Sequence, residues 1–355
     1  MGRASKTRLE NSTIANLLGF EFALFFISMS DVVLEEAVRR AGAGEAIALC
    51  TIVAARGSTP QAAGARMLVL GDGRLIGTLG GGCVEAEVRQ QALRLLAARI
   101  TRLVTFKLDH DYGWDDGLIC GGTMDILVQT LARAQDVEPL RLVLEQVKQG
   151  TGAALELPYQ TESGEQRTYR EALEPPPRLL IVGAGHIGQA LAGLAGNLGF
   201  DVTVLDDRPD CASRERFPWA RRIIGDIEAE LARYPIDPQT YVIIVTRGHR
   251  HDGRALAVVI NSAAKYLGLI GSRRKVLTIF RDLREQGVSI DRLVRVHAPI
   301  GLEIGAVTVP EIATSIAAEL IAVRRGTEGH SGSAMKFDEA RLRELLDSDG
   351  ASEAT

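Results

Sequence analysis

The sequence has little cysteine. It contains four cysteines in 355 residues, and no two of them lie close together. This number is too small for a disulfide scaffold, and the spacing lacks the C-x-x-C pattern of a redox or zinc site. Thiols stay reduced in the cytoplasm, so we expect a cytoplasmic protein.

The sequence also lacks a large excess of charge of either sign. Its net charge of -4 comes from 41 basic and 45 acidic residues. A protein that coats nucleic acid through general electrostatics would be strongly basic, so this function is disfavoured. Long apolar runs are missing too. The run over residues 14–29 is interrupted by Asn16 and Glu21 and is too short for a transmembrane helix of about 20 residues, so no membrane partner is expected.

The length and the ordinary proportion of 46% hydrophobic residues predict two globular domains. Met29 opens an amphipathic pattern, which favours translation from this residue and makes the preceding segment a tail or a mis-assigned start. A polar stretch that ends in three prolines predicts a linker. The predicted parts are a tail (1–28), an N-terminal α/β or α+β domain (29–160), a linker (161–177), a Rossmann-like doubly wound parallel-sheet domain (178–326) and a flexible tail (327–355).

Glycine is abundant, with 37 residues, and it is clustered. The run Gly183-Ala184-Gly185-His186-Ile187-Gly188 follows an apolar β-like run and precedes a helical pattern, which is typical of a dinucleotide site. Gly185 would let the backbone approach a pyrophosphate, and Asp206 could bond ribose hydroxyls. A repurposed Rossmann site is the alternative. His186 would touch the ligand or lie on the surface at the helix N-terminus.

Two further clusters follow predicted strands of the second domain. His249, His251 and Asp252 could supply acid–base groups or metal ligands, or Asp252 could cap the next helix. Arg273 belongs to the run Ser272-Arg273-Arg274-Lys275 at a predicted helix N-terminus. This run favours contact with a phosphate, and a solvated charge run is its alternative.

Three glycine-rich segments of the first domain carry a cation, hydroxyls or a thiol. A helix N-terminus would lower the pKa of Cys83, and thiolates on amide-rich loops suit a thiophilic metal and an anionic group. Structural cysteines are the alternative. Cys50 is assigned to the core and Cys211 receives no role. The candidate residues are Arg56, Ser58, Thr59, Gly80, Gly81, Gly82, Cys83, Cys120, Gly121 and Gly122.

The order of these motifs resembles a known family. The segments are GSTPQAAGARM, GTLGGGCVEAEV, CGGTMDILVQ, GAGHIG, GLIGSRRK and HAPIGLEIGAVTVPEIATSIAAELI. Together they resemble the XdhC/CoxI family of accessory proteins for xanthine dehydrogenase and related molybdenum hydroxylases, over about residues 31–326. Two features depart from the family pattern: the apolar leader 1–28, and the unusually basic segment TRGHRHDG, which puts a role for His249 in doubt.

The resemblance implies a chaperone that binds molybdenum cofactor, supports its sulfuration and inserts it into an apo-hydroxylase of the xanthine or aldehyde dehydrogenase type. A cysteine desulfurase would be a further partner, and a homodimer would suit a dimeric client. The resemblance carries the role over to Gly80–Cys83, Cys120–Gly122 and the neighbouring Arg56–Thr59 loop. Cys83 and Cys120 are then the expected molybdenum contacts. The Rossmann site would hold the nucleotide of a dinucleotide form of the cofactor, or NAD(P), or would shape a docking face.

Two other functions remain open from the residues alone. An NAD(P)-dependent oxidoreductase would use the second domain, with His249 or His251 as the acid–base residue. The first domain offers no matching acid–base pair, and this reading leaves the thiols unexplained. A regulatory module that senses a nucleotide is the third possibility. The favoured interpretation is a cofactor carrier rather than a turnover enzyme.

Overall fold

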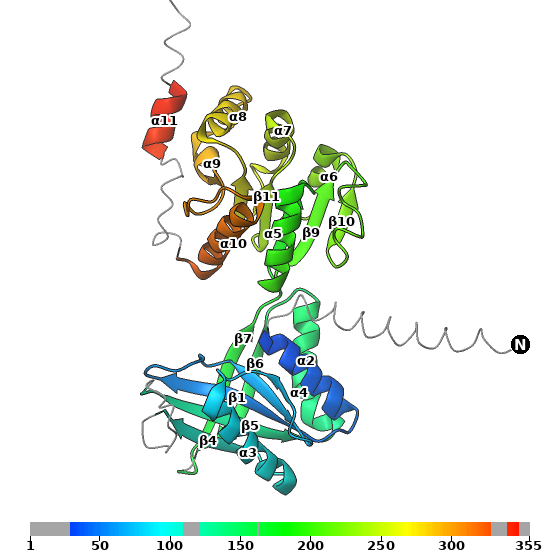
Figure 1. Cartoon of the computed structure of the whole chain (residues 1–355), viewed down its shortest axis with the longest axis vertical. Coiled ribbons are helices and arrows are strands. Elements are labelled where there is room, and N and C mark those ends of the chain that lie inside the picture. Colours follow the sequence, from blue (N-terminus) through cyan, green and yellow to red (C-terminus); the bar gives the residue numbers. More distant parts are fainter. Residues whose placement is uncertain (1–28, 109–120, 162, 328–338, 348–355) are drawn as a thin grey trace, which may run out of the picture. The chain divides into compact units, whose positions relative to one another are not determined.

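The computed structural model describes residues 29–108, 121–161, 163–327 and 339–347. The chain divides into two compact units at Pro175 and Pro176 (Figure 1). We call the first the N-terminal unit and the second the Rossmann unit. Residues 1–28, with the predicted start at Met29 as their boundary, lie outside the described residues.

The N-terminal unit is built on a five-stranded sheet in the order β3-β2-β1-β5-β4. Every neighbouring pair is antiparallel, so the unit is α+β, one of the two classes that the sequence allowed. The strands are β1 (Ile47–Arg56), β2 (Arg66–Leu70), β3 (Leu75–Gly77), β4 (Arg102–Lys107) and β5 (Thr123–Leu131).

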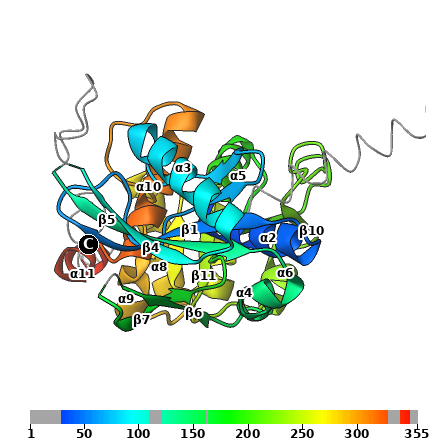
Figure 2. The same cartoon turned by 90° about the horizontal axis from the view of Figure 1, so that it is seen from below.

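Both faces of this sheet are covered, which explains why β1 is apolar along most of its length. One face packs against α3 (Gly82–Ala98) and contains Cys50. The other packs against α2 (Met29–Gly42), α4 (Ala134–Lys148) and the hairpin of β6 (Ala153–Gln160) and β7 (Gln166–Leu173). Figure 2 shows α3 on the opposite side of the strands from α4 and the hairpin. The core assignment of Cys50 is correct, and burial raises the pKa of its thiol to about 12.

The predicted linker 161–177 is wrong over residues 166–173. Strand β7 occupies Gln166–Leu173 and pairs with β6 along its whole length. Its residues are mostly exposed and polar, because the two-stranded hairpin has only one face against the core. That polarity, together with the prolines that follow, imitates a linker.

The Rossmann unit contains a six-stranded parallel sheet in the order β10-β9-β8-β11-β12-β13. This order confirms the predicted doubly wound fold, whose ligands bind at the carboxyl ends of the strands. The strands are β8 (Arg178–Val182), β9 (Asp201–Asp206), β10 (Arg221–Ile224), β11 (Thr240–Ile244), β12 (Tyr266–Leu269) and β13 (Val296–His297).

Helices cover both faces of this parallel sheet (Figure 1). One face packs against α5 (His186–Asn197) and α10 (Val309–Arg325). The other packs against α6 (Ile227–Arg233), α7 (His249–Val259), α8 (Arg273–Glu285) and α9 (Ile290–Val294). Among the described residues, no helix combines the length and the apolar character that crossing a bilayer requires.

The predicted flexible tail 327–355 contains a packed helix. Helix α11 (Glu339–Asp347) buries Leu342 and Leu346 in the core of the Rossmann unit. Arg281 Nη2 also donates a hydrogen bond to Leu345 O at 3.4 Å. The short amphipathic stretch is therefore a structural element, because its apolar stripe finds a partner surface on α8 and α9.

Candidate functional site

Three loops of the N-terminal unit meet at the ends of its strands. Residues 56–60 follow β1, residues 78–82 lead into α3, and residues 121–122 lead into β5. An isolated parallel β-bridge joins Ser58 to Gly121. We call these three segments the loop site. They contain eight of the ten candidate residues predicted in this unit, so distant parts of the sequence converge as expected.

Glycine is required where these loops touch. A Cβ on Gly122 would lie 2.2 Å from Ser58 O, and one on Gly80 would lie 2.5 Å from Pro60 Cβ. Real Cβ atoms do not approach backbone oxygens this closely, so any other residue would push the loops apart. The glycines thus set the spacing between the loops.

Gly80, Gly81 and Gly82 form the most unusual backbone of the site. Their φ angles are +114°, +82° and +64°, three successive values in the left-handed region that other residues rarely adopt. Among the described residues, no atom would lie within 4 Å of a Cβ on Gly81 or Gly82, so the described part of the chain leaves the space beside them open. The loop therefore presents bare backbone at the N-terminus of α3.

Glu85 holds this loop from the first turn of α3. Its Oε1 accepts hydrogen bonds from Thr78 Oγ1 at 2.5 Å, from Leu79 N at 3.0 Å and from Gly81 N at 2.9 Å. Burial opposes ionisation, but these hydrogen bonds lower the pKa of Glu85 below its ordinary value. Sequence reasoning noticed Glu85 only as a neighbour of Cys83. An acidic residue in the first turn after a glycine run was the signal that could have found it.

Arg56 supplies a cation to the loop site. Its Nη2 donates to Asp125 Oδ2 at 2.8 Å, and Asp125 Oδ1 accepts from Thr105 Oγ1 at 2.8 Å. The Arg56 side chain is 62% exposed, so Asp125 orients the guanidinium without covering it. Ser58 is exposed, while Thr59 Oγ1 donates to Gln61 O at 3.0 Å and stiffens the loop.

The glycine-rich loop of the Rossmann unit has the predicted geometry. Gly183 has a φ of +117°, and a Cβ there would lie 2.5 Å from Val245 O. A Cβ on Gly188 would lie 2.0 Å from Gly183 O, whereas one on Gly185 would meet no described atom within 4 Å. The first and third glycines are therefore needed for packing, and the second leaves room for a ligand. His186 is exposed as the first residue of α5.

Asp206 ends β9 as expected, but its carboxylate is already occupied. Oδ2 accepts from Ala184 N at 2.7 Å and from Arg208 Nη2 at 2.9 Å. Oδ1 accepts from Arg208 N and Nε, both at 2.9 Å. These four bonds fill the roughly four lone-pair sites of a carboxylate. Asp206 therefore ties the glycine loop to Arg208, and its predicted bond to ribose would require Arg208 to move.

The clusters after β11 and β12 are joined by a buried ion pair. Asp252 is buried and accepts from Thr246 N at 3.0 Å and Thr246 Oγ1 at 2.6 Å. Its other oxygen pairs with Lys275 Nζ. Asp252 thus holds the loop after β11. His249 and Arg273 lie exposed at the first positions of α7 and α8.

Comparison with known proteins bears on both units. Residues 41–107 match the family model for XdhC and CoxI proteins, and residues 179–320 match the model for the XdhC Rossmann domain. The chain belongs to the XdhC/CoxI family. The matched ranges contain most of the loop site and the whole glycine-rich loop of the Rossmann unit.

Curated relatives carry three different names. The chain is 33% identical over 284 residues to an uncharacterized protein, YqeB, of Escherichia coli. This alignment covers 79% of the present chain but only 44% of YqeB. It is 29% identical to a protein of Bacillus subtilis named as a probable xanthine dehydrogenase subunit, covering 84% of this chain and 98% of the relative. It is 28% identical to the molybdenum cofactor insertion chaperone PaoD of Escherichia coli, covering 84% of this chain and 90% of PaoD.

A solved structure extends the likeness to three dimensions. The crystal structure of a protein named as a xanthine dehydrogenase from Bacillus halodurans aligns with a TM-score of 0.72 and 26% identity. The alignment covers 84% of this chain and 97% of that protein. The shared architecture therefore spans both units of this XdhC/CoxI family chain.

The two candidate metal ligands of this family member are not tested by the structure. Cys120 and the Cys83 side chain lie outside the described residues, although Cys83 belongs to α3 by its backbone. Within the described part of the chain, no group of three His, Cys, Asp or Glu residues is arranged to hold a metal ion. The molybdenum contacts of Cys83 and Cys120 stay predictions.

Sequence reasoning missed a buried polar network around Glu319 of α10. Glu319 Oε2 accepts from Tyr266 Oη at 2.6 Å and from Gly301 N at 2.8 Å, and Oε1 lies 3.0 Å from His297 Nδ1. Burial opposes ionisation, but the hydrogen bonds from His297, Tyr266 and Gly301 lower the pKa of Glu319 to about 2. A single acid within the apolar helical run ATSIAAELIAV was the signal. The network fixes the loop before α10.

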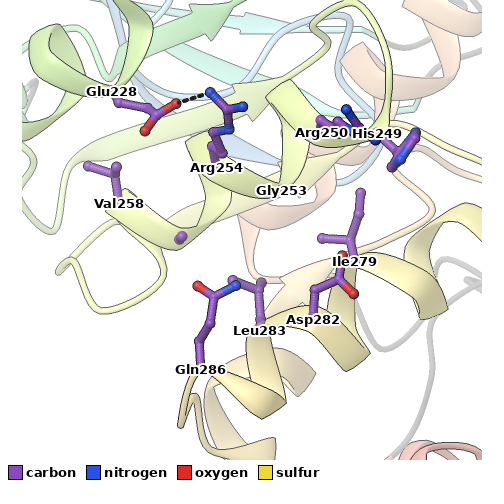
Figure 3. A pocket seen from close by; sticks show the side chains of 11 residues that line it. Glu228, His249, Arg250, Gly253, Arg254, Val258, Ile279, Asp282, Leu283 and Gln286 are labelled. Carbon is purple, nitrogen blue, oxygen red and sulfur yellow. Dashed lines mark hydrogen bonds and ion pairs between the residues drawn. The ribbon is translucent and has the colours of Figure 1, made fainter.

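The Rossmann unit also has a cavity of about 470 Å³ between α7 and α8 (Figure 3). Apolar side chains such as Ile279 and Leu283 line it beside charged ones, and Arg254 pairs with Glu228 across its rim at 3.3 Å. His249 is the one predicted residue in its wall. The cavity belongs to the outer helix layer and is lined by none of the glycine-loop residues.

Proposed function

We propose that this chain carries molybdenum cofactor and inserts it into a hydroxylase of the xanthine or aldehyde dehydrogenase type. The observation that carries the proposal is the convergence of three glycine-rich loops on one site of the N-terminal unit. The names of the Bacillus subtilis relative and of PaoD support the same role.

The chemistry of the loop site suits this cargo. Molybdopterin combines a flat pterin, a phosphate and a dithiolene-bound metal. The site offers open glycine backbone at Gly81 and Gly82 and an oriented guanidinium at Arg56. Cys83 and Cys120 would contact the metal end, because soft thiolates suit a sulfur-bound metal. A cysteine desulfurase would supply the sulfur for sulfuration.

The Rossmann unit would bind the nucleotide of a dinucleotide cofactor or shape the docking face for the client. The open space at Gly185 supports the first role. An NAD(P)-dependent oxidoreductase receives less support, because it gives no role to the converging loops of the N-terminal unit. A cytoplasmic location and a homodimer remain part of the proposal.

Anaerobic purification from cells that make molybdenum cofactor tests this function. We expect about one molybdenum and one pterin per chain, measured by elemental analysis and pterin fluorescence. Cys83→Ser or Cys120→Ser should lower the molybdenum content, and the bound cofactor should activate an apo-hydroxylase. Cys211→Ser is the matched control, because this thiol lies in the other unit. Nicotinamide reduction by a protein without pterin would instead support the oxidoreductase.

A further inference from the structure

Three amides of the glycine loop are not available to a ligand in the way that a phosphate loop requires. Leu79 N and Gly81 N donate to Glu85, and Gly80 N donates to Thr78 Oγ1 at 3.1 Å. Three successive amide donors are therefore satisfied inside the protein. Phosphate-binding loops work in the opposite way, because their amides point at the anion.

The groups that this segment can offer a ligand are the backbone groups that are not already bonded within the protein. Each peptide unit has one donor and one acceptor, so the use of these three donors leaves only acceptor capacity on the backbone of Leu79, Gly80 and Gly81. The Glu85 carboxylate, whose Oε1 accepts from Leu79 N and Gly81 N, adds a further acceptor beside this backbone. Phosphate offers mainly hydrogen-bond acceptors and carries negative charge, so it does not complement a surface of acceptors beside a carboxylate. An uncharged heterocycle with N–H donors does complement such a surface.

We propose that Glu85 is a positioning and selectivity residue, which makes residues 78–82 the subsite for the pterin and excludes phosphate from them. The identity of the ligand rests on the proposed function. Arg56, which is oriented by Asp125 and largely exposed, is the cation left in the loop site for the phosphate. The two ends of the cargo are thereby assigned to different loops.

The first test uses the amide resonances of Leu79, Gly80 and Gly81 in the labelled full-length protein. Titration with free pterin should shift them, whereas inorganic phosphate should leave them unchanged. In Glu85→Ala, phosphate should begin to shift these amides and pterin affinity should fall about tenfold, because a charge-assisted hydrogen-bond acceptor is lost. Glu85→Gln, which keeps one oxygen acceptor, should retain the loop geometry and respond weakly to phosphate.

Glu87→Ala is the matched control. Glu87 lies two residues further along α3, is also a glutamate, and its carboxylate makes no hydrogen bond to another described residue. It should behave as wild type. The proposal is overturned if phosphate shifts the three amides in wild type, if pterin leaves them unmoved, or if Glu85→Ala and Glu87→Ala respond alike. Wild type that carries no pterin from cofactor-producing cells would refute the proposed function, and the phosphate titration would still decide the role of Glu85.

Discussion

At the scale of single residues, buried and half-buried carboxylates organise the loops of this protein. Glu85, Asp206 and Glu319 each accept at least one backbone N–H of a loop, and hydrogen bonds lower the pKa of each. Desolvation costs a carboxylate several kcal/mol, which only good hydrogen bonds offset. These acids therefore fix the backbones of loops in both units. Replacing one of them would leave loop amides without their acceptor.

Asp206 gives the residue-scale prediction. Asp206→Asn should lower the free energy of unfolding at pH 7 by about 3 kcal/mol, because it removes a buried negative charge that accepts two hydrogen bonds from the Arg208 side chain, and Asp207, 3.9 Å from Arg208 Nε, does not replace them. Asp207→Asn is the control and should cost less than about 1 kcal/mol, since its pair with Arg247 is partly exposed and its contact with Arg208 Nε is long, at 3.9 Å. Urea denaturation measures both.

The pH dependence of the Asp206 variant has a definite sign. Hydrogen bonds from Arg208 and Ala184 outweigh burial and lower the pKa of Asp206 from 3.8 to about 2. A depressed pKa in the folded state contributes stability above the unfolded value and loses it as the pH falls through the folded one. The difference between wild type and Asp206→Asn should therefore shrink between about pH 4 and pH 2. A constant difference over this range would contradict the assignment.

At the scale of elements, the β6–β7 hairpin braces the loop site. Arg66 of β2 is fully buried and pairs with Glu171 of β7, which also accepts from Tyr169 Oη at 3.1 Å. A Cβ on Gly64 would lie 3.2 Å from Glu171 Oε1, so this cluster supports the segment that returns from residues 56–60 to β2. The hairpin is thus part of the support of the site rather than a connection between domains.

Glu171→Gln tests the brace. It should destabilise the protein by about 3–5 kcal/mol, because Arg66 would be a buried cation without a carboxylate and its Nε and Nη1 already lack partners among the described atoms. Glu156→Gln is the matched control on the same hairpin. Its pair with Arg170 is exposed, so a change below about 1 kcal/mol is expected. Urea denaturation measures the free energy of unfolding of both variants. Equal losses of this free energy would show that the buried Arg66–Glu171 pair matters no more than the exposed Arg170–Glu156 pair.

The elements also show what sequence reasoning can reach. Strands β8, β9 and β11 were predictable because buried parallel strands are continuous apolar runs, and the glycines were predictable because few other residues tolerate their backbone. Strand β7 was missed because its pairing with β6 and the burial of only one of its faces depend on the tertiary structure, which the local sequence does not reveal. The roles of Glu85 and Asp206 were missed because hydrogen-bond partners depend on the path of a loop, which composition does not encode.

At the scale of the whole molecule, each unit has its own apolar core. The N-terminal unit has a core on each face of its antiparallel sheet, and the Rossmann unit has one on each face of its parallel sheet. Units with separate cores can fold as separate cooperative blocks. The variants Asp206→Asn and Glu171→Gln lie in different blocks, so together they report on both.

Differential scanning calorimetry of the full chain should therefore show two transitions. Asp206→Asn should lower the midpoint of one and Glu171→Gln the midpoint of the other, because each change removes a charge partner inside a single unit. For units of this size, a loss of about 3 kcal/mol corresponds to a shift of roughly 6–12 °C. If molybdenum cofactor without an attached nucleotide binds the loop site, loading should raise only the transition that Glu171→Gln lowers, since a ligand stabilises the state that binds it. A single transition that both variants lower would show that the units unfold together.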